Sequence, residues 1–172
     1  MCWRTDVLTC WSFLIRFNTP TPQHVNTPTL QHLITFHTED IQFQLDNTEK
    51  TQQWILQTIE SERATLSFIN FIFCSDTYLH RINLEYLNHD TYTDIITFPY
   101  SDKTIESDIF ISIERVRENA QKFDTTFTHE LHRVIIHGVL HLLGYHDKTP
   151  EQQQQMKNKE DFWLERIMHF NL

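Results

Sequence analysis

The sequence predicts a single α+β domain over residues 33–172, with a mixed sheet of about four or five strands and packed helices. Segments with the period of strands alternate with segments that have the period of helices, and the joints between them are short. Hydrophobic residues make up 40% of the 172 residues and include thirteen Phe, enough for a substantial core. The two glycines of the chain both fall within residues 137–147, beside three histidines and an aspartate. We therefore expect a metal site on a central helix and the glycine turn that follows it.

Five segments have the composition of strands. Apolar residues alternate over residues 33–37 and 40–45, and β-prone runs occupy residues 66–74, 95–100 and 108–113. These runs are short and lie between polar or helix-like segments. Each is therefore predicted to be a separate strand.

Five helices are predicted in the same region. Their expected ranges are residues 47–62, 76–87 and 114–123, a helix that begins at Thr126 or Thr128, and residues 150–170. Ser75 is an N-cap residue before the second helix, and Thr149, Pro150 and Gln152 form a capping box at the start of the last. The buried faces are expected to include Leu79, Ile82 and Tyr86 in the second helix, and Met156, Trp163, Ile167 and Phe170 in the last. The polar run of residues 151–161 is interpreted as a solvated helix face.

The first 32 residues differ in composition from the rest. The octapeptide NTPTPQHV at residues 18–25 is followed by the related NTPTLQHL at residues 26–33, with no apolar periodicity. Such a segment cannot bury a core, so residues 1–32 are predicted to be an unstructured extension. We interpret it as a translation start assigned too early, with the native protein beginning near Leu33.

Charge and cysteine content restrict the possible partners and location. The formal net charge of −9 excludes a simple, highly basic nucleic-acid-binding protein, so an RNA partner would need a metal ion or a local basic patch. The three cysteines, at positions 2, 10 and 74, form neither a metal-ligand spacing nor a disulfide framework. No segment resembles a membrane-spanning helix, so we expect no membrane partner and a cytoplasmic location.

The motif of residues 137–147 has the chemistry of a metal site. His137 and His141 are four residues apart, so on a helix their side chains lie on the same face and can reach one ion. Gly138 lies inside that helix, where a glycine indicates close approach by another backbone or a ligand. Gly144 is placed to end the helix in a left-handed turn, which can bring His146 or Asp147 toward the same ion. Two imidazoles with a third ligand and an open position are typical of catalytic zinc.

The spacing H-x3-H-x2-G-x2-D is similar to the metal-binding helix of metzincin peptidases. Those enzymes carry a glutamate directly after the first histidine, where it serves as general base. Here that residue is Gly138, so proteolysis is disfavoured.

Three segments together resemble the YbeY family of metal-dependent endoribonucleases. They read DTYTDIITFPY, SDIFISIERVRENAQKF and ELHRVIIHGVLHLLGYHDKT, and the resemblance covers nearly all of residues 33–172. It implies an α+β fold, one zinc ion with other divalent metals as alternatives, and cleavage of single-stranded RNA. It also implies roles in small-subunit ribosomal RNA 3′-end processing and ribosome quality control, with the ribosome or its small subunit and assembly proteins as partners.

The resemblance selects Asp147 as the third ligand beside His137 and His141, with His146 as the alternative. Many family members read DH after the tyrosine where this chain reads HD, so Asp147 stands where they place a histidine. An arginine common in the family before the strand of residues 95–100 is replaced by Leu87. Basic residues that could take over its contact with phosphate are Arg81, Arg115, Arg117, Lys122 and Arg133.

The expected mechanism depends on the metal, because no side chain is assigned as a general base. The ion is expected to polarise a phosphoryl oxygen and to activate water as the nucleophile. The alternative is a metal-stabilised ribosome-assembly factor whose work is binding, without significant catalysis.

Removal of residues 1–32 should leave the melting temperature within about 2 °C of the full-length value, because the repeat offers no pattern for a core. Thermal unfolding and RNA cleavage by the two forms check this expectation. A large drop in melting temperature would contradict it, and mass spectrometry of the natural N-terminus tests the start position.

Overall fold

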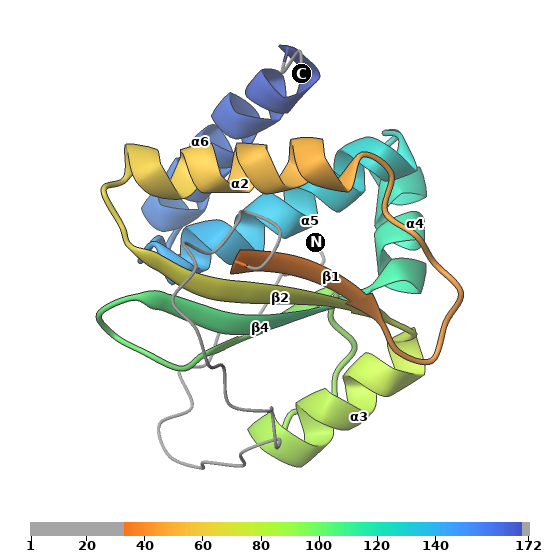
Figure 1. Cartoon of the computed structure of the whole chain (residues 1–172). Coiled ribbons are helices and arrows are strands. Elements are labelled where there is room, and N and C mark those ends of the chain that lie inside the picture. The colour runs from red at the N-terminus through yellow and green to blue at the C-terminus, as the bar shows by residue number, and fades with distance from the viewer. Residues whose placement is uncertain (1–32, 170–172) are drawn as a thin grey trace.

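The computed structural model describes residues 33–169, with side chains for residues 33–167. The predicted extension of residues 1–32 and the predicted apolar position Phe170 lie outside the described residues. In the described part, four strands form one sheet on which five helices pack (Figure 1). The predicted α+β class with a mixed sheet is confirmed.

The sheet combines parallel and antiparallel pairs. Its strands are β1 (Ile34–Thr38), β2 (Leu66–Cys74), β3 (Ile95–Pro99) and β4 (Ile105–Ser112). Their spatial order is β1-β2-β4-β3, with β1 and β4 parallel to β2 and with β3 antiparallel to β4. The two long central strands therefore lie between two short edge strands, β1 and β3.

Residues 40–45 do not form the predicted strand. The chain leaves the edge of the sheet after Thr38 and runs irregularly until the next helix. The apolar alternation still marks burial, because Leu45 is buried and Ile41 and Phe43 pack against the core. Alternate burial requires only an extended chain against a surface, whereas a strand also needs a partner for its backbone hydrogen bonds. The alternating pattern of residues 40–45 therefore predicted the burial of the apolar side chains correctly, but the prediction of a strand was wrong.

The helices begin close to the predicted positions. They are α2 (Thr48–Ser61), α3 (Asp76–Leu87), α4 (Ile113–Lys122), α5 (Phe127–Leu142) and α6 (Pro150–His169). The side chains of Ser75 and Thr126 accept hydrogen bonds from the first turns of α3 and α5, so the predicted N-cap at Ser75 is confirmed and Thr126 caps the helix expected to begin there or at Thr128. Thr149 and Gln152 bond reciprocally, as the predicted capping box requires. None of the helices in the described residues is both long enough and apolar enough to cross a bilayer.

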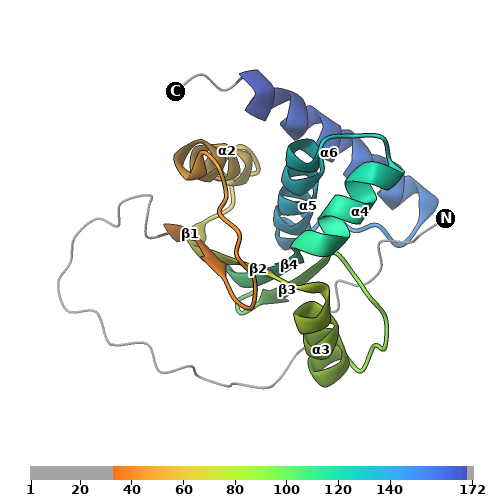
Figure 2. The ribbon, with the colours of Figure 1, turned by 90° about the vertical axis from the view of Figure 1, so that its right-hand side faces the viewer.

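The sheet separates a large helical layer from a small one. Helices α2, α4, α5 and α6 lie on one side, and α3 lies on the other (Figures 1 and 2). The main core includes Trp54 and Phe71, and a smaller core under α3 includes Leu79 and Ile82. Tyr86 does not join that face as predicted and is 45% exposed, because the buried stripe of α3 runs from Leu79 through Asn83 to Leu87.

Helix α5 approaches the sheet closely at Gly138. A Cβ added there would lie 2.7 Å from Ile95 Cδ1 and 3.4 Å from Ile109 Cδ1. The expected crowding is present, but it comes from side chains of β3 and β4 rather than from a backbone or a ligand. The glycine therefore lets α5 lie close to the sheet. This close packing fixes the positions of the residues that flank Gly138 in the helix.

Candidate metal centre

Two histidines of α5 point to the same side of the helix, as their spacing predicts. The Nε2 atoms of His137 and His141 lie 2.9 Å apart, and the ring planes are nearly perpendicular, at 89°. Both side chains are almost fully buried, with exposed fractions of 5% for His137 and 3% for His141. Burial of two imidazole edges against each other indicates that something other than bulk water satisfies them.

The predicted left-handed turn at the end of α5 is confirmed. Gly144 has φ +89°, its N–H bonds to the carbonyl of His141, and the N–H of Tyr145 bonds to the carbonyl of Leu140. These two bonds form a Schellman motif, which reverses the chain direction at the end of a helix. No heavy atom lies within 4 Å of the Cβ position of Gly144. Glycine is therefore required by the backbone conformation and not by crowding.

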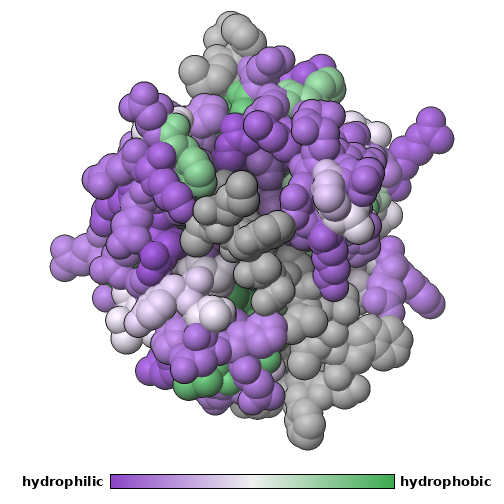
Figure 3. Space-filling model, turned by 180° about the vertical axis from the view of Figure 1, so that it is seen from behind, coloured by the Kyte–Doolittle hydropathy of each residue, from purple (hydrophilic) through white to green (hydrophobic). Residues whose placement is uncertain are grey.

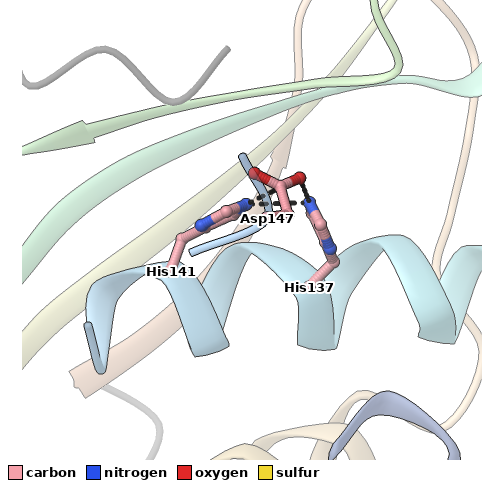
Figure 4. Close-up of side chains that lie close together, drawn as sticks. All are labelled: His137, His141 and Asp147. Atoms are coloured by element: carbon pink, nitrogen blue, oxygen red, sulfur yellow. Dashed lines mark hydrogen bonds and ion pairs between the residues drawn. The ribbon is translucent and has the colours of Figure 1, made fainter. Parts of the chain in front are cut away.

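The turn brings Asp147 back over the two histidines, as Figure 4 shows. Its Oδ2 lies 3.8 Å from His137 Nε2 and 3.9 Å from His141 Nε2, and its side chain is 20% exposed. His146 is exposed and lies outside this group. The structure thus gathers His137, His141 and Asp147 and separates His146 from them.

The other ring nitrogen of each histidine faces an acceptor. Nδ1 of His137 lies 2.7 Å from Glu160 Oε1, and Nδ1 of His141 lies 2.9 Å from the carbonyl oxygen of Tyr145. A carboxylate and a carbonyl can only accept, so a ring with its proton on Nδ1 satisfies each of them and leaves the lone pair on Nε2 for a metal ion. Two lone pairs 2.9 Å apart repel each other unless a cation or a proton lies between them.

The protonation state of His141 suits metal binding. Burial first, and the neighbouring His137 second, lower the pKa of His141 to about 3. The ring is therefore neutral at physiological pH, and its Nε2 is free to coordinate. Protonation does not compete with a metal ion at this nitrogen above mildly acidic pH.

The donor set fits a divalent transition metal. Two imidazole nitrogens and one carboxylate oxygen are a known ligand set of catalytic zinc, which keeps another position open. Zn–N bonds of about 2.0–2.1 Å in tetrahedral geometry separate two donors by roughly 3.3 Å. The separations here are 2.9, 3.8 and 3.9 Å, so small side-chain movements would bring the donors to that spacing.

Sequence interpretation missed Glu160, which contacts His137. The polar run of residues 151–161 predicts a solvated helix face, but Glu160 is only 5% exposed and is buried beside the apolar residues of α6. The available signal was its spacing, four residues after Met156 and three before Trp163, which are both buried. The helical period therefore could have placed this carboxylate inside the protein, although not beside a histidine.

The basic residues considered for phosphate contact differ in their surroundings. Arg115 pairs with Asp76 and Arg133 pairs with Glu160, so both are engaged in ion pairs. The exposed candidates are Arg81, Arg117 and Lys122, each lying over an aromatic ring. Leu87, at the position of the family arginine, packs into the small core under α3 and offers no phosphate contact.

The fold and the site together define a class of protein: an α+β domain with a His–His–Asp group, able to hold a metal ion, at the end of its central helix. The family model described as Endoribonuclease YbeY matches residues 33–168. The chain belongs to this family.

Individual relatives show how far the similarity extends. The protein named endoribonuclease YbeY from Amoebophilus asiaticus is 50% identical over 133 residues, which are 76% of this chain and 90% of the relative. The one from Christiangramia forsetii is 49% identical over 140 residues, 81% of this chain and 95% of the relative. The solution structure of TM1509 from Thermotoga maritima matches with a TM-score of 0.55 and 26% identity over 78% of this chain and 89% of that one.

Gly144→Ala should destabilise the protein by about 1 kcal/mol or more, because alanine is strained at positive φ while no contact compensates. Urea unfolding measures the change. Gly144→Asn is the control and should cost less, because asparagine tolerates the left-handed region better. Equal stability of wild type and Gly144→Ala would show that the turn does not need a glycine.

Proposed function

We propose that this chain is a zinc-dependent endoribonuclease that cleaves single-stranded ribosomal RNA. It would act in the cytoplasm, in 3′-end processing of small-subunit ribosomal RNA and in ribosome quality control. The observation that carries the proposal is the convergence of His137, His141 and Asp147 in a chain of the YbeY family. Relatives named as endoribonucleases, with up to 50% identity in the comparisons above, support the reaction class.

The metal ligands are proposed from the chemistry of the donors. His137 and His141 would bind through Nε2 and Asp147 through its carboxylate, with Zn²⁺ as the expected ion and other divalent metals as alternatives. When bound, the ion would supply Lewis-acid stabilisation of the phosphodiester and would lower the pKa of water. These residues are therefore expected to act together, so that loss of one affects metal content and cleavage alike.

The protein side chains around the histidines serve positioning rather than proton transfer. Gly138 replaces the glutamate that peptidases of similar spacing use as general base. Glu160 contacts Nδ1 of His137, on the edge of the ring opposite Nε2, so it faces away from a ligand bound at Nε2. We therefore assign no general base among the described residues.

Electrostatics favour an RNA substrate that is delivered by a larger assembly. The chain has a formal net charge of −9, and the face seen in Figure 3 is mostly hydrophilic with a few separate hydrophobic patches. Free RNA should bind weakly, because few basic residues are available for phosphates, and added salt should weaken the contacts that do form. We propose that the ribosome, its small subunit or an assembly protein presents the RNA.

RNA cleavage should require the metal and both histidines. In single-turnover assays on purified ribosomal RNA, a chelator, His137→Ala or His141→Ala should each lower the rate by at least about a hundredfold, since the metal contributes several kcal/mol to catalysis. Re-addition of Zn²⁺ to the chelated wild type should restore the rate, and circular dichroism should show that the variants stay folded.

Two results would redirect this proposal. Stoichiometric metal in both histidine variants would refute the site. Metal binding and association with the small subunit, without cleavage above background, would favour the assembly factor that works by binding alone.

The third ligand should be Asp147 and not His146. Asp147→Ala should lose the metal, whereas His146→Ala should keep it, because His146 is exposed and outside the group. Asp147→His should also retain metal, since imidazole is an equally suitable ligand. Metal content after dialysis measures all three variants. Loss of metal from His146→Ala with retention in Asp147→Ala would reverse the assignment.

A further inference from the structure

A buried chain of charged groups connects α6 to the first histidine of the site. Arg133 Nη1 lies 2.8 Å from Glu160 Oε2, and Glu160 Oε1 lies 2.7 Å from Nδ1 of His137. The side chain of Glu160 is 6% exposed and that of Arg133 is 18% exposed. One carboxylate therefore uses its two oxygens for two different partners on α5.

We propose that Glu160 is a positioning residue that fixes the orientation and the tautomer of His137, and that Arg133 in turn fixes Glu160. This inference rests on the proposed metal site and assigns it a support from a different helix. Glu160 would not touch the ion or the RNA and would act only through the imidazole.

The geometry of the imidazole explains how such support works. The two nitrogens lie on different edges of the ring, so a hydrogen bond at Nδ1 fixes the direction in which Nε2 points. A charged acceptor at Nδ1 also keeps the proton there and leaves the lone pair on Nε2. Because Glu160 is buried, water cannot readily take its place if the carboxylate is lost. His141 has a similar arrangement, but its acceptor is the backbone carbonyl of Tyr145.

Arg133 gives the carboxylate its fixed direction. Its guanidinium binds two neighbouring carboxylates of α6, with Nη1 at Glu160 and Nη2 at 2.9 Å from Asp161 Oδ1. A buried carboxylate is costly without a cation, and here the cation holds Oε2, so that Oε1 is directed at His137. The arginine therefore supports His137 indirectly, through the carboxylate.

Asp161 offers a matched control for this hypothesis. It follows Glu160 in sequence, carries the same charge and binds the same arginine. Its side chain is 48% exposed and contacts Arg133 rather than His137. A role that is only structural, as an ion pair between α5 and α6, predicts a loss of stability in either variant with no specific effect on zinc affinity.

The test compares Glu160→Gln with Asp161→Asn in the full-length chain. Zinc affinity, measured by competition with a chromophoric chelator, should fall about 10- to 100-fold in Glu160→Gln, as for other carboxylates that orient a ligand histidine. In Asp161→Asn it should change less than about threefold. In the zinc-free protein, the side-chain ¹⁵N signals of His137 should show the Nδ1–H tautomer in wild type and Asp161→Asn, and a mixture of tautomers in Glu160→Gln.

A second variant keeps the inference testable if Glu160→Gln does not fold. Glu160→Asp retains the charge for Arg133 but withdraws the carboxylate from His137, so it should lose zinc affinity in the same direction. Equal zinc affinities of the folded Glu160 variant and Asp161→Asn would overturn the positioning role.

Failure of the metal site itself would look different. In that case the wild type would bind no stoichiometric zinc, or His137→Ala would retain it. Wild-type binding that is lost in His137→Ala but unchanged in the Glu160 variants would refute this inference alone and leave the proposed function standing.

Discussion

The close packing of α5 against the sheet is the constraint on which the site depends. At Gly138 the helix lies so near β3 and β4 that a Cβ would come within 2.7 Å of Ile95. One face of α5 is thereby committed to the core, and His137 and His141 are held on a neighbouring side, almost fully buried. A larger residue at Gly138 would have to displace the end of the Ile95 side chain, or else move the helix and with it the donors of the site.

Helix α6 is the second support, although it supplies no metal ligand in the proposal. Three consecutive charged residues on it bind groups at the end of α2 and on α5. Lys159 binds Glu62 at the end of α2, Glu160 binds His137 and Arg133, and Asp161 binds Arg133. The last helix of the fold therefore links the candidate site to helices far apart in sequence. Such a network is stable only when all of its members are paired.

Much of the structure was predictable from local patterns. The capped helix starts, the long strand over residues 66–74 and the turn at Gly144 follow from rules that involve neighbours within about five residues, and the structure confirms them. The gathering of His137 with His141 is of the same kind, because helix geometry alone places residues i and i+4 together. The wrong strand prediction at residues 40–45 was an error of strand pairing, which depends on a distant part of the chain.

The sequence by itself determined the α+β class, the helix that carries the histidines and the left-handed turn that follows it. All three depend on hydrophobic period, capping and the conformational freedom of glycine, which are properties of short segments. The residues alone left Asp147 and His146 open, and only the resemblance favoured Asp147. The tertiary structure shows that Asp147 faces the histidines and that Glu160 lies 2.7 Å from His137. The physical reason is that the path of the chain beyond the Gly144 turn places Asp147, and the packing of α6 against α5 places Glu160, and neither follows from the period of a short segment.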